Sequence, residues 1–122
     1  MPNLSQRSLH NLESCHSDLQ KVAHEAIKHF DFTVICGHRG REAQNKAYKE
    51  GKSKLKFPDS KHNKTPSYAF DSVPHPLDWN DRKAFDAMGA AMKTAAKKVG
   101  VKIIWGGDWK SFPDAPHVEL GA

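Results

Sequence analysis

The longest regular pattern in the sequence is a stripe of apolar residues in the segment 81–99. Apolar side chains recur there three and four residues apart, while polar side chains fill the opposite face. The stripe consists of Phe85, Met88, Gly89, Met92, Ala95, Ala96 and Val99. We expect an amphipathic helix over residues 81–98, with Asn80 as its N-cap and Gly100 as its stop. A helix of this kind needs a second layer to cover its apolar face.

Short runs of β-branched and aromatic residues supply that second layer, because they predict strands. The predicted strands cover residues 32–36, 68–73, 101–105 and 117–120. We expect two more helices, one over residues 18–30 with Ser17 and Gln20 as a capping box, and a short one over 41–50 closed by Gly51. The order of these elements favours an α+β fold, a small antiparallel sheet with flanking helices.

The chain length and composition indicate one soluble globular unit. With 122 residues the chain has room for a single domain, residues 1–122. Hydrophobic residues make up 38% and charged residues 27%, which excludes a disordered polymer. No apolar run approaches the ~20 residues of a membrane-spanning helix. The first residues lack the apolar core of a secretory signal, so we expect synthesis in the cytoplasm. Cys15 and Cys36 are expected to be reduced thiols.

The positive charge of the chain is concentrated in one segment. The net charge is +5, and residues 46–64 alone contain seven lysines against two acidic residues. Residues 52–67 lack periodicity and contain two prolines, which predicts a long lysine-rich loop. Such a charge excess implies an anionic partner, such as nucleic acid, a membrane face or an acidic cell-wall polymer. A solvated lysine loop without a partner is the alternative.

Two predicted strands present polar residues on the same face of the sheet. Asp71 alternates with Phe70, and His117 alternates with Val118, so each polar side chain points away from its apolar neighbour. A sheet that packs the apolar pair inward presents Asp71 and His117 toward a cleft, near the loop that contains His62. Two imidazoles and one carboxylate are a common ligand set for catalytic Zn²⁺, with the fourth position left to water. From spacing alone, ordinary surface histidines and aspartates remain the alternative.

Four ordered stretches of the sequence are more specific than any single spacing. They cover residues 36–44 (CGHRGREAQ), 60–74 (SKHNKTPSYAFDSVP), 105–109 (WGGDW) and 114–120 (DAPHVEL). Together they resemble the zinc peptidases that include D-alanyl-D-alanine carboxypeptidases and, more closely, the L-alanyl-D-glutamate endopeptidases used as bacteriophage endolysins. The opening residues 4–13 are also similar to the start of those phage enzymes. The resemblance covers nearly the whole chain in the same order.

The resemblance implies a role for individual residues of the site. It places the Zn²⁺ ligands at His62, Asp71 and His117. It places the catalytic acidic residue at Asp114, which would act first as general base and then as acid. It places at Arg39 the cation that binds substrate and polarises the scissile carbonyl.

Five further residues are predicted around this centre. His38, Gln44 and Ser60 are candidates for substrate contact beside the predicted cation. Glu119 shares a strand face with a predicted ligand, so it is a candidate hydrogen-bond partner for it, and Asp108 is a second candidate with a plain turn residue as the alternative. Several relatives carry Glu where this chain has Asp at position 114, so Glu119 is also the alternative base.

These expectations define a function and its rivals. We expect a zinc-dependent peptidoglycan endopeptidase of the phage endolysin type, which hydrolyses the L-alanyl-D-glutamate bond of the stem peptide and lyses the bacterial host. The protein would be a monomer that waits in the host cytoplasm until its release to the cell wall, and its partner would be peptidoglycan. Nucleic acid is not expected, because aromatic residues are not interleaved with the lysines. The alternatives are a D-alanyl-D-alanine carboxypeptidase, or a non-catalytic basic zinc module that binds the wall or nucleic acid.

Overall fold

The computed structural model describes residues 2–111 and 113–121 of the chain. In that part, one antiparallel sheet has the strand order β1–β2–β4–β3. The strands are β1 (Phe32–Cys36), β2 (Ala69–Pro74), β3 (Ile103–Trp105) and β4 (His117–Leu120). The helices are α1 (Gln6–Glu13), α2 (Ser17–Ala26), α3 (Arg41–Lys49) and α4 (Arg82–Val99), with short 3₁₀ helices η1 (Lys61–Asn63) and η2 (Gly106–Asp108). This arrangement confirms the expected α+β class.

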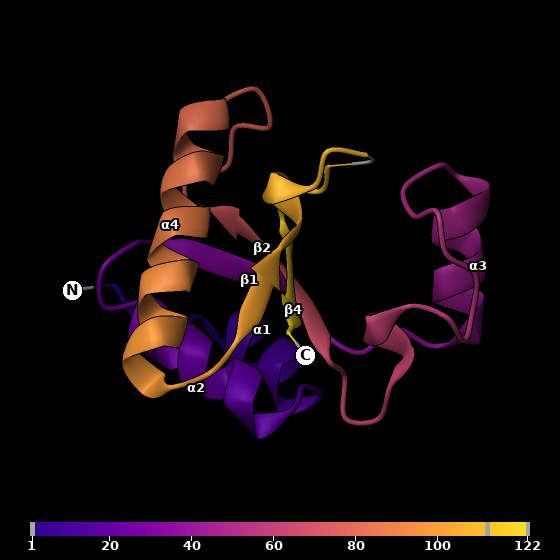
Figure 1. The fold of residues 1–122 in the computed structure, drawn as a ribbon, viewed down its shortest axis with the longest axis horizontal. Coiled ribbons are helices and arrows are strands. Elements are labelled where there is room, and N and C mark those ends of the chain that lie inside the picture. Colours follow the sequence, from indigo (N-terminus) through magenta and orange to yellow (C-terminus); the bar gives the residue numbers. More distant parts are fainter. Residues whose placement is uncertain (1, 112, 122) are drawn as a thin grey trace.

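The helices divide into a group that builds the core and one that stands apart. Helices α1, α2 and α4 gather around the sheet, while α3 and the loops beside it extend away from it (Figure 1). The core between the first group and the sheet includes Leu19, Val22, Phe70, Met88 and Met92, all fully buried. Burial of each such side chain stabilises the fold by about 1.5–3 kcal/mol. Helix α3 is therefore not needed to cover this core and is available to form one wall of a cleft.

Helix α4 is the predicted amphipathic helix, and its apolar stripe is buried. It ends as expected at Gly100, whose φ of 76° is the left-handed conformation that glycine adopts at a helix C-terminus. The predicted N-cap was wrong by one residue. The Asp81 carboxylate accepts a hydrogen bond from the Ala84 N–H at 3.1 Å, whereas the Asn80 N–H is bonded to the Asp78 side chain in the preceding turn.

Helix α1 was not predicted, because its contacts with the sheet are mainly polar. Ser8 and Asn11 both bond to the backbone of Val34 on the edge strand β1. The Ser8 Oγ accepts from the Val34 N–H at 2.9 Å, and the Asn11 amide donates to the Val34 carbonyl at 2.8 Å. The helix thereby covers a sheet edge that would otherwise be open. An apolar periodicity does not reveal a helix that docks through hydrogen bonds.

Helix α2 differs from its prediction at both ends. His16 is the N-cap, and its Nδ1 accepts from the Asp18 N–H at 3.0 Å. Gln20 donates to the Cys15 carbonyl at 3.0 Å, so the predicted capping box does not form. The α-helix ends at Ala26, because tighter backbone bonds form the turn that follows. No helix within 2–111 or 113–121 combines the length and apolar character needed to cross a membrane.

The remaining elements follow their predictions with small shifts. Helix α3 ends at Lys49 and is followed by Gly51 with a φ of 78°. The predicted strand over 101–105 begins only at Ile103, and β2 runs one residue later than expected. The predicted loop over 52–67 is irregular except for η1. Cys15 and Cys36 are free thiols, as expected.

Candidate metal and active site

A cleft of about 1140 Å³ opens between the sheet and the region formed by α3, η1 and the loop between them. One wall carries side chains of β2 and β4, and the other carries α3 and the lysine-rich loop. The polar residues central to the site are Arg39, His62, Asp71, Asp114, His117 and Glu119. All four residues that the sequence predicted as ligands or base therefore share one cleft with the predicted substrate-binding arginine.

Strand pairing brings the distant parts of the chain together. Asp71 of β2 lies directly opposite His117 of β4, so both side chains stand on the same face of the sheet. His62 reaches them from η1, whose N-cap Ser60 accepts from the His62 N–H at 3.2 Å. The Tyr68 N–H bonds to the Lys61 carbonyl at 3.0 Å and ties η1 to the start of β2.

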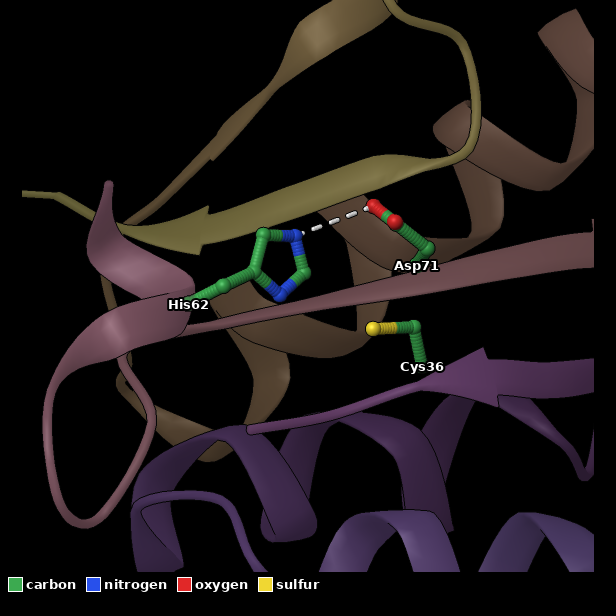
Figure 2. A group of neighbouring side chains, drawn as sticks. All are labelled: Cys36, His62 and Asp71. Carbon is green, nitrogen blue, oxygen red and sulfur yellow. Dashed lines mark ion pairs between the residues drawn. The ribbon is translucent and has the colours of Figure 1, made fainter. Parts of the chain in front are cut away.

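Two buried atoms in the cleft have no hydrogen-bond partner among the described residues. They are His62 Nε2 and Asp71 Oδ1, which lie 3.3 Å apart (Figure 2). His117 Nδ1 lies 3.4 Å from the same Asp71 oxygen. A buried polar atom without a partner costs about 1–3 kcal/mol, whereas a bound cation would satisfy these atoms together.

The other polar atoms of the three residues are occupied, which orients them. His62 Nδ1 donates to the Gly37 carbonyl at 2.8 Å, and so leaves Nε2 as the free acceptor. His117 Nε2 bonds to Glu119 Oε1 at 2.8 Å. Asp71 Oδ2 accepts from the Arg39 guanidinium at 3.1 Å. Outer partners of this kind fix the tautomer and direction of metal-binding side chains.

The charges of the site favour a cation beside Asp71. Burial lowers the pKa of His62, but the Asp71 carboxylate and the Cys36 contact outweigh it and raise that pKa to about 10. Burial opposes the charged form of Asp71, yet the nearby His117 and His62 rings, when protonated, hold the pKa of Asp71 well below its usual range. The position between these residues thus attracts either a proton or a metal ion.

Two overlapping groups of side chains could hold a metal ion. Asp71, Asp114 and His117 have ligand atoms within 4.8 Å of one another, and so do Cys36, His62 and Asp71. Asp71 is shared, and His62 and His117 both lie next to its Oδ1 atom. Nitrogen and oxygen donors around one buried carboxylate suit a divalent cation such as Zn²⁺, and the residues present fit that ion.

Asp114 is held close to the centre by backbone contacts. Its N–H bonds to the Gly106 carbonyl at 2.9 Å, and its carbonyl accepts from the His117 N–H at 3.1 Å. A Cβ on Gly106 would collide with the Asp114 carbonyl, so this close approach requires glycine there. Burial and the negative charge of Asp71 raise the pKa of the Asp114 carboxyl.

Glu119 is engaged by two other residues. One carboxylate oxygen bonds to His117, and the other lies 2.8 Å from Lys61 Nζ. The structure places Glu119 behind the His117 ring, where it can orient that ring. Both Glu119 oxygens therefore have a partner, whereas the Asp114 side chain has no hydrogen bond within the described part of the chain.

Two residues predicted to contact substrate, Gln44 and Ser60, are buried in the structure. Gln44 is fully buried, where it accepts from Arg39 Nη1 at 3.1 Å and donates to the Leu55 carbonyl at 2.6 Å. It holds the arginine and the lysine-rich loop in place and is not exposed to a ligand, which corrects the expected substrate contact. Ser60 lines the cleft but is buried as the cap of η1.

Two predicted residues lie outside the cleft. His38 is exposed and faces Thr65, with 3.4 Å between Thr65 Oγ1 and His38 Nε2. Asp108 forms an ion pair with Lys93 of α4, so it serves as a surface link between η2 and α4 and supports no ligand. A turn residue was the alternative stated for Asp108, and the structure supports that alternative.

Sequence reasoning missed three contributors to the site. The sequence patterns predict a reduced thiol at Cys36 and a basic loop around Lys61, and they predict no role for Trp109. Trp109 packs over His117 with 5.1 Å between ring centroids, and it lines the cleft. No local pattern distinguishes these residues, because each reaches the site through a partner far away in the chain: Asp71 for Cys36, Glu119 for Lys61 and His117 for Trp109.

Comparisons with known proteins agree with this geometry. Residues 2–120 match the family described as phage L-alanyl-D-glutamate peptidase. The L-alanyl-D-glutamate peptidase of Escherichia phage T5 is 39% identical over 104 residues, which covers 80% of this chain and 74% of the phage protein. The peptidoglycan L-alanyl-D-glutamate endopeptidase CwlK of Bacillus subtilis is 27% identical over 125 residues, covering 92% of this chain and 73% of CwlK. The crystal structure of the L-Ala D-Glu endopeptidase ChiX of Serratia marcescens has a TM-score of 0.84 and 29% identity, and the match covers 97% of this chain and 89% of ChiX. This chain therefore belongs to the phage L-alanyl-D-glutamate peptidase family.

Proposed function

We propose that this chain is a zinc-dependent peptidoglycan endopeptidase that hydrolyses the L-alanyl-D-glutamate bond of the stem peptide. Membership of a peptidase family supports hydrolysis of a peptide bond, and the names of its relatives support this bond. The observation that carries the proposal is the pair of buried, unpartnered ligand atoms on His62 and Asp71 beside His117, within the described part of the chain. We further propose that it acts as a monomer at the bacterial wall, after release from the host cytoplasm, and without nucleic acid.

The ligands we propose are His62 Nε2, Asp71 Oδ1 and His117 Nδ1. When bound, Zn²⁺ supplies a Lewis acid that lowers the pKa of water and polarises the scissile carbonyl. Three protein ligands suit this chemistry, because they leave a position for water or substrate. The outer contacts to Gly37 and Glu119 keep both imidazole rings in the required tautomer.

Asp114 is the residue we propose for proton transfer. It is half-buried in the cleft, and its carboxylate belongs to the group with Asp71 and His117. In the proposed step the Asp114 carboxylate takes a proton from the attacking water and then gives it to the leaving amine. The surroundings that raise its pKa make it a better proton acceptor than a fully exposed carboxylate.

Arg39 is the residue we propose for stabilising the developing oxyanion. Its guanidinium is anchored by Asp71 and Gln44 and borders the cleft. A guanidinium has five N–H donors, so these two contacts leave others for a carbonyl oxygen. A fixed, charged donor in such a position contributes about 2–4 kcal/mol to lowering a barrier.

The lysines around the cleft support an anionic substrate. Lys46 of α3, Lys52 and Lys54 of the loop, and Lys110 near the opposite wall all line it. Peptidoglycan stem peptides carry free carboxylates, which such a positive rim attracts. The lysine-rich loop predicted from the sequence therefore lies beside the cleft in which we propose that the anionic substrate binds.

The test is digestion of purified Gram-negative peptidoglycan by the zinc-loaded protein, followed by mass spectrometry of the products. We expect fragments with a new amino terminus at D-glutamate, and no such fragments after chelation. Release of free D-alanine would instead indicate the carboxypeptidase. Sedimentation with the wall and unchanged stem peptides would indicate a non-catalytic binding module.

A further inference from the structure

Cys36 lies on the metal-binding side of the sheet because of a β-bulge. In a regular strand Cys36 would share the core-facing side with Val34, two residues earlier. The pairing of β1 with β2 instead places Val34 opposite Ser72 and Cys36 opposite Asp71. Ile35 is the extra residue, and the irregularity turns Cys36 toward the face that carries Asp71.

The thiol is within reach of two proposed ligands. Cys36 Sγ, a His62 nitrogen and an Asp71 oxygen all lie within 4.8 Å of one another, and Figure 2 shows the three side chains converging. The other polar contacts of the sulfur are long, 3.6 Å to the Gly37 carbonyl and 3.8 Å from Arg39 Nη2. The sulfur is therefore not committed to a strong hydrogen bond.

A second observation supports a ligand at this group. His62 Nε2 is buried without a hydrogen-bond partner among the described residues, and the residue is only 2% exposed. Common Zn–S and Zn–N distances put sulfur and nitrogen about 3.6 Å apart in a tetrahedral site. The 4.8 Å limit within which the three ligand atoms lie is about 1.2 Å wider than that spacing.

We infer that Cys36 supplies a thiolate ligand to the metal held by His62 and Asp71, an inference that rests on the metal site of the proposed function. The thiol gives its proton to solvent as its sulfur binds the metal. The thiolate would join the nitrogen of His62 and the oxygen of Asp71 in one ligand group, while His117 belongs to the second group around the same carboxylate.

The experiment replaces zinc with Co²⁺ and records the absorption spectrum of the full chain. We expect visible ligand-field bands together with a near-ultraviolet thiolate-to-Co²⁺ charge-transfer band. Cys36→Ser should remove the charge-transfer band and weaken Zn²⁺ binding at least tenfold, measured by competition with a chromophoric chelator. The matched control is Cys15→Ser, since Cys15 is a buried thiol bonded to the Ala69 carbonyl at 3.8 Å, and it should retain the band.

The outcomes separate this inference from the proposed function. Ligand-field bands without a charge-transfer band in the unmodified protein overturn Cys36 ligation and leave the metal site standing. The absence of all Co²⁺ bands overturns both. If Cys36→Ser does not fold, alkylation of Cys36 in the unmodified protein gives a second measurement: Zn²⁺ should slow it strongly, and equal rates with and without Zn²⁺ overturn the inference.

Discussion

At the scale of single residues, the site depends on which polar atoms are already occupied. His62, Asp71 and His117 each use one polar atom for a fixed contact, and each directs its other atom toward a common region. Asp114 has no comparable side-chain partner among the described residues. This difference in side-chain contacts is the reason for proposing Asp114, and not Asp71 or Glu119, for proton transfer.

The first prediction concerns Asp114. Asp114→Asn should lower kcat/KM by about 10²–10⁴, because an amide cannot accept the proton of the attacking water. Zn²⁺ affinity should change little, since the three proposed ligands remain. The measurement combines peptide-release kinetics with chelator competition. Asp108→Asn is the control, because Asp108 is paired with Lys93 outside the cleft, and its activity should stay near that of the unmodified protein.

The second prediction concerns Glu119. Glu119→Gln should weaken Zn²⁺ binding by about 10–100-fold, because a neutral amide no longer polarises the His117 ring. Activity should return when the metal concentration is raised. An activity that stays lost at saturating Zn²⁺ would instead make Glu119 the base and would contradict the assignment of Asp114.

At the scale of elements, the site depends on how α4 and the sheet pack. Gly89 of α4 lies against the indole of Trp105, the last residue of β3. Trp105 in turn donates to the Ala115 carbonyl at 2.6 Å, which holds the segment between Asp114 and His117. Helix α4, which lies outside the cleft, therefore helps to position Asp114, the proposed base, and His117, a proposed ligand.

The third prediction tests this packing. Gly89→Ala should destabilise the protein by about 1–3 kcal/mol, because the added Cβ would lie 2.5 Å from the Trp105 ring. The measurement is the free energy of unfolding from urea titration. The control is Ala90→Ser on the exposed side of the same helix, with an expected change within about 0.5 kcal/mol. Equal effects of the two substitutions would show that α4 can shift without cost.

At the scale of the whole molecule, metal binding and folding stability should be linked. The site gathers residues from η1, β2 and β4, so a bound ion stabilises the folded chain over the unfolded one. In the metal-free protein a proton on His62 takes part of this role, because the pKa of His62 is raised from 6.5 to about 10 on folding.

The fourth prediction follows from the sign of that shift. A raised pKa contributes stability that is fully present below pH 6.5 and is lost as the pH rises through about 10. Thermal unfolding in the presence of a chelator should therefore show stability falling above pH 6.5, by up to about 1.4 kcal/mol per pH unit from this group. With Zn²⁺ on Nε2, the folded His62 cannot take up a second proton, and the fall should be absent. A metal-free profile that is flat over this range would contradict the raised pKa.

The sequence by itself determined the elements with strong periodicity and predicted the residues of the site. The stripe of α4, the strand β1 and the alternation in β4 depend on side chains a few residues apart, so they can be recognised locally. The ordered motifs then identified the family and its expected ligands, His62, Asp71 and His117.

Only the tertiary structure decided how those residues are used. The polar docking of α1, the burial of Gln44 and the ion pair of Asp108 depend on partners far away in the chain. The bulge that turns Cys36 toward Asp71 depends on the pairing of two strands, which no local pattern encodes. Contacts between segments decide which atoms are left free, and the free atoms decide the chemistry.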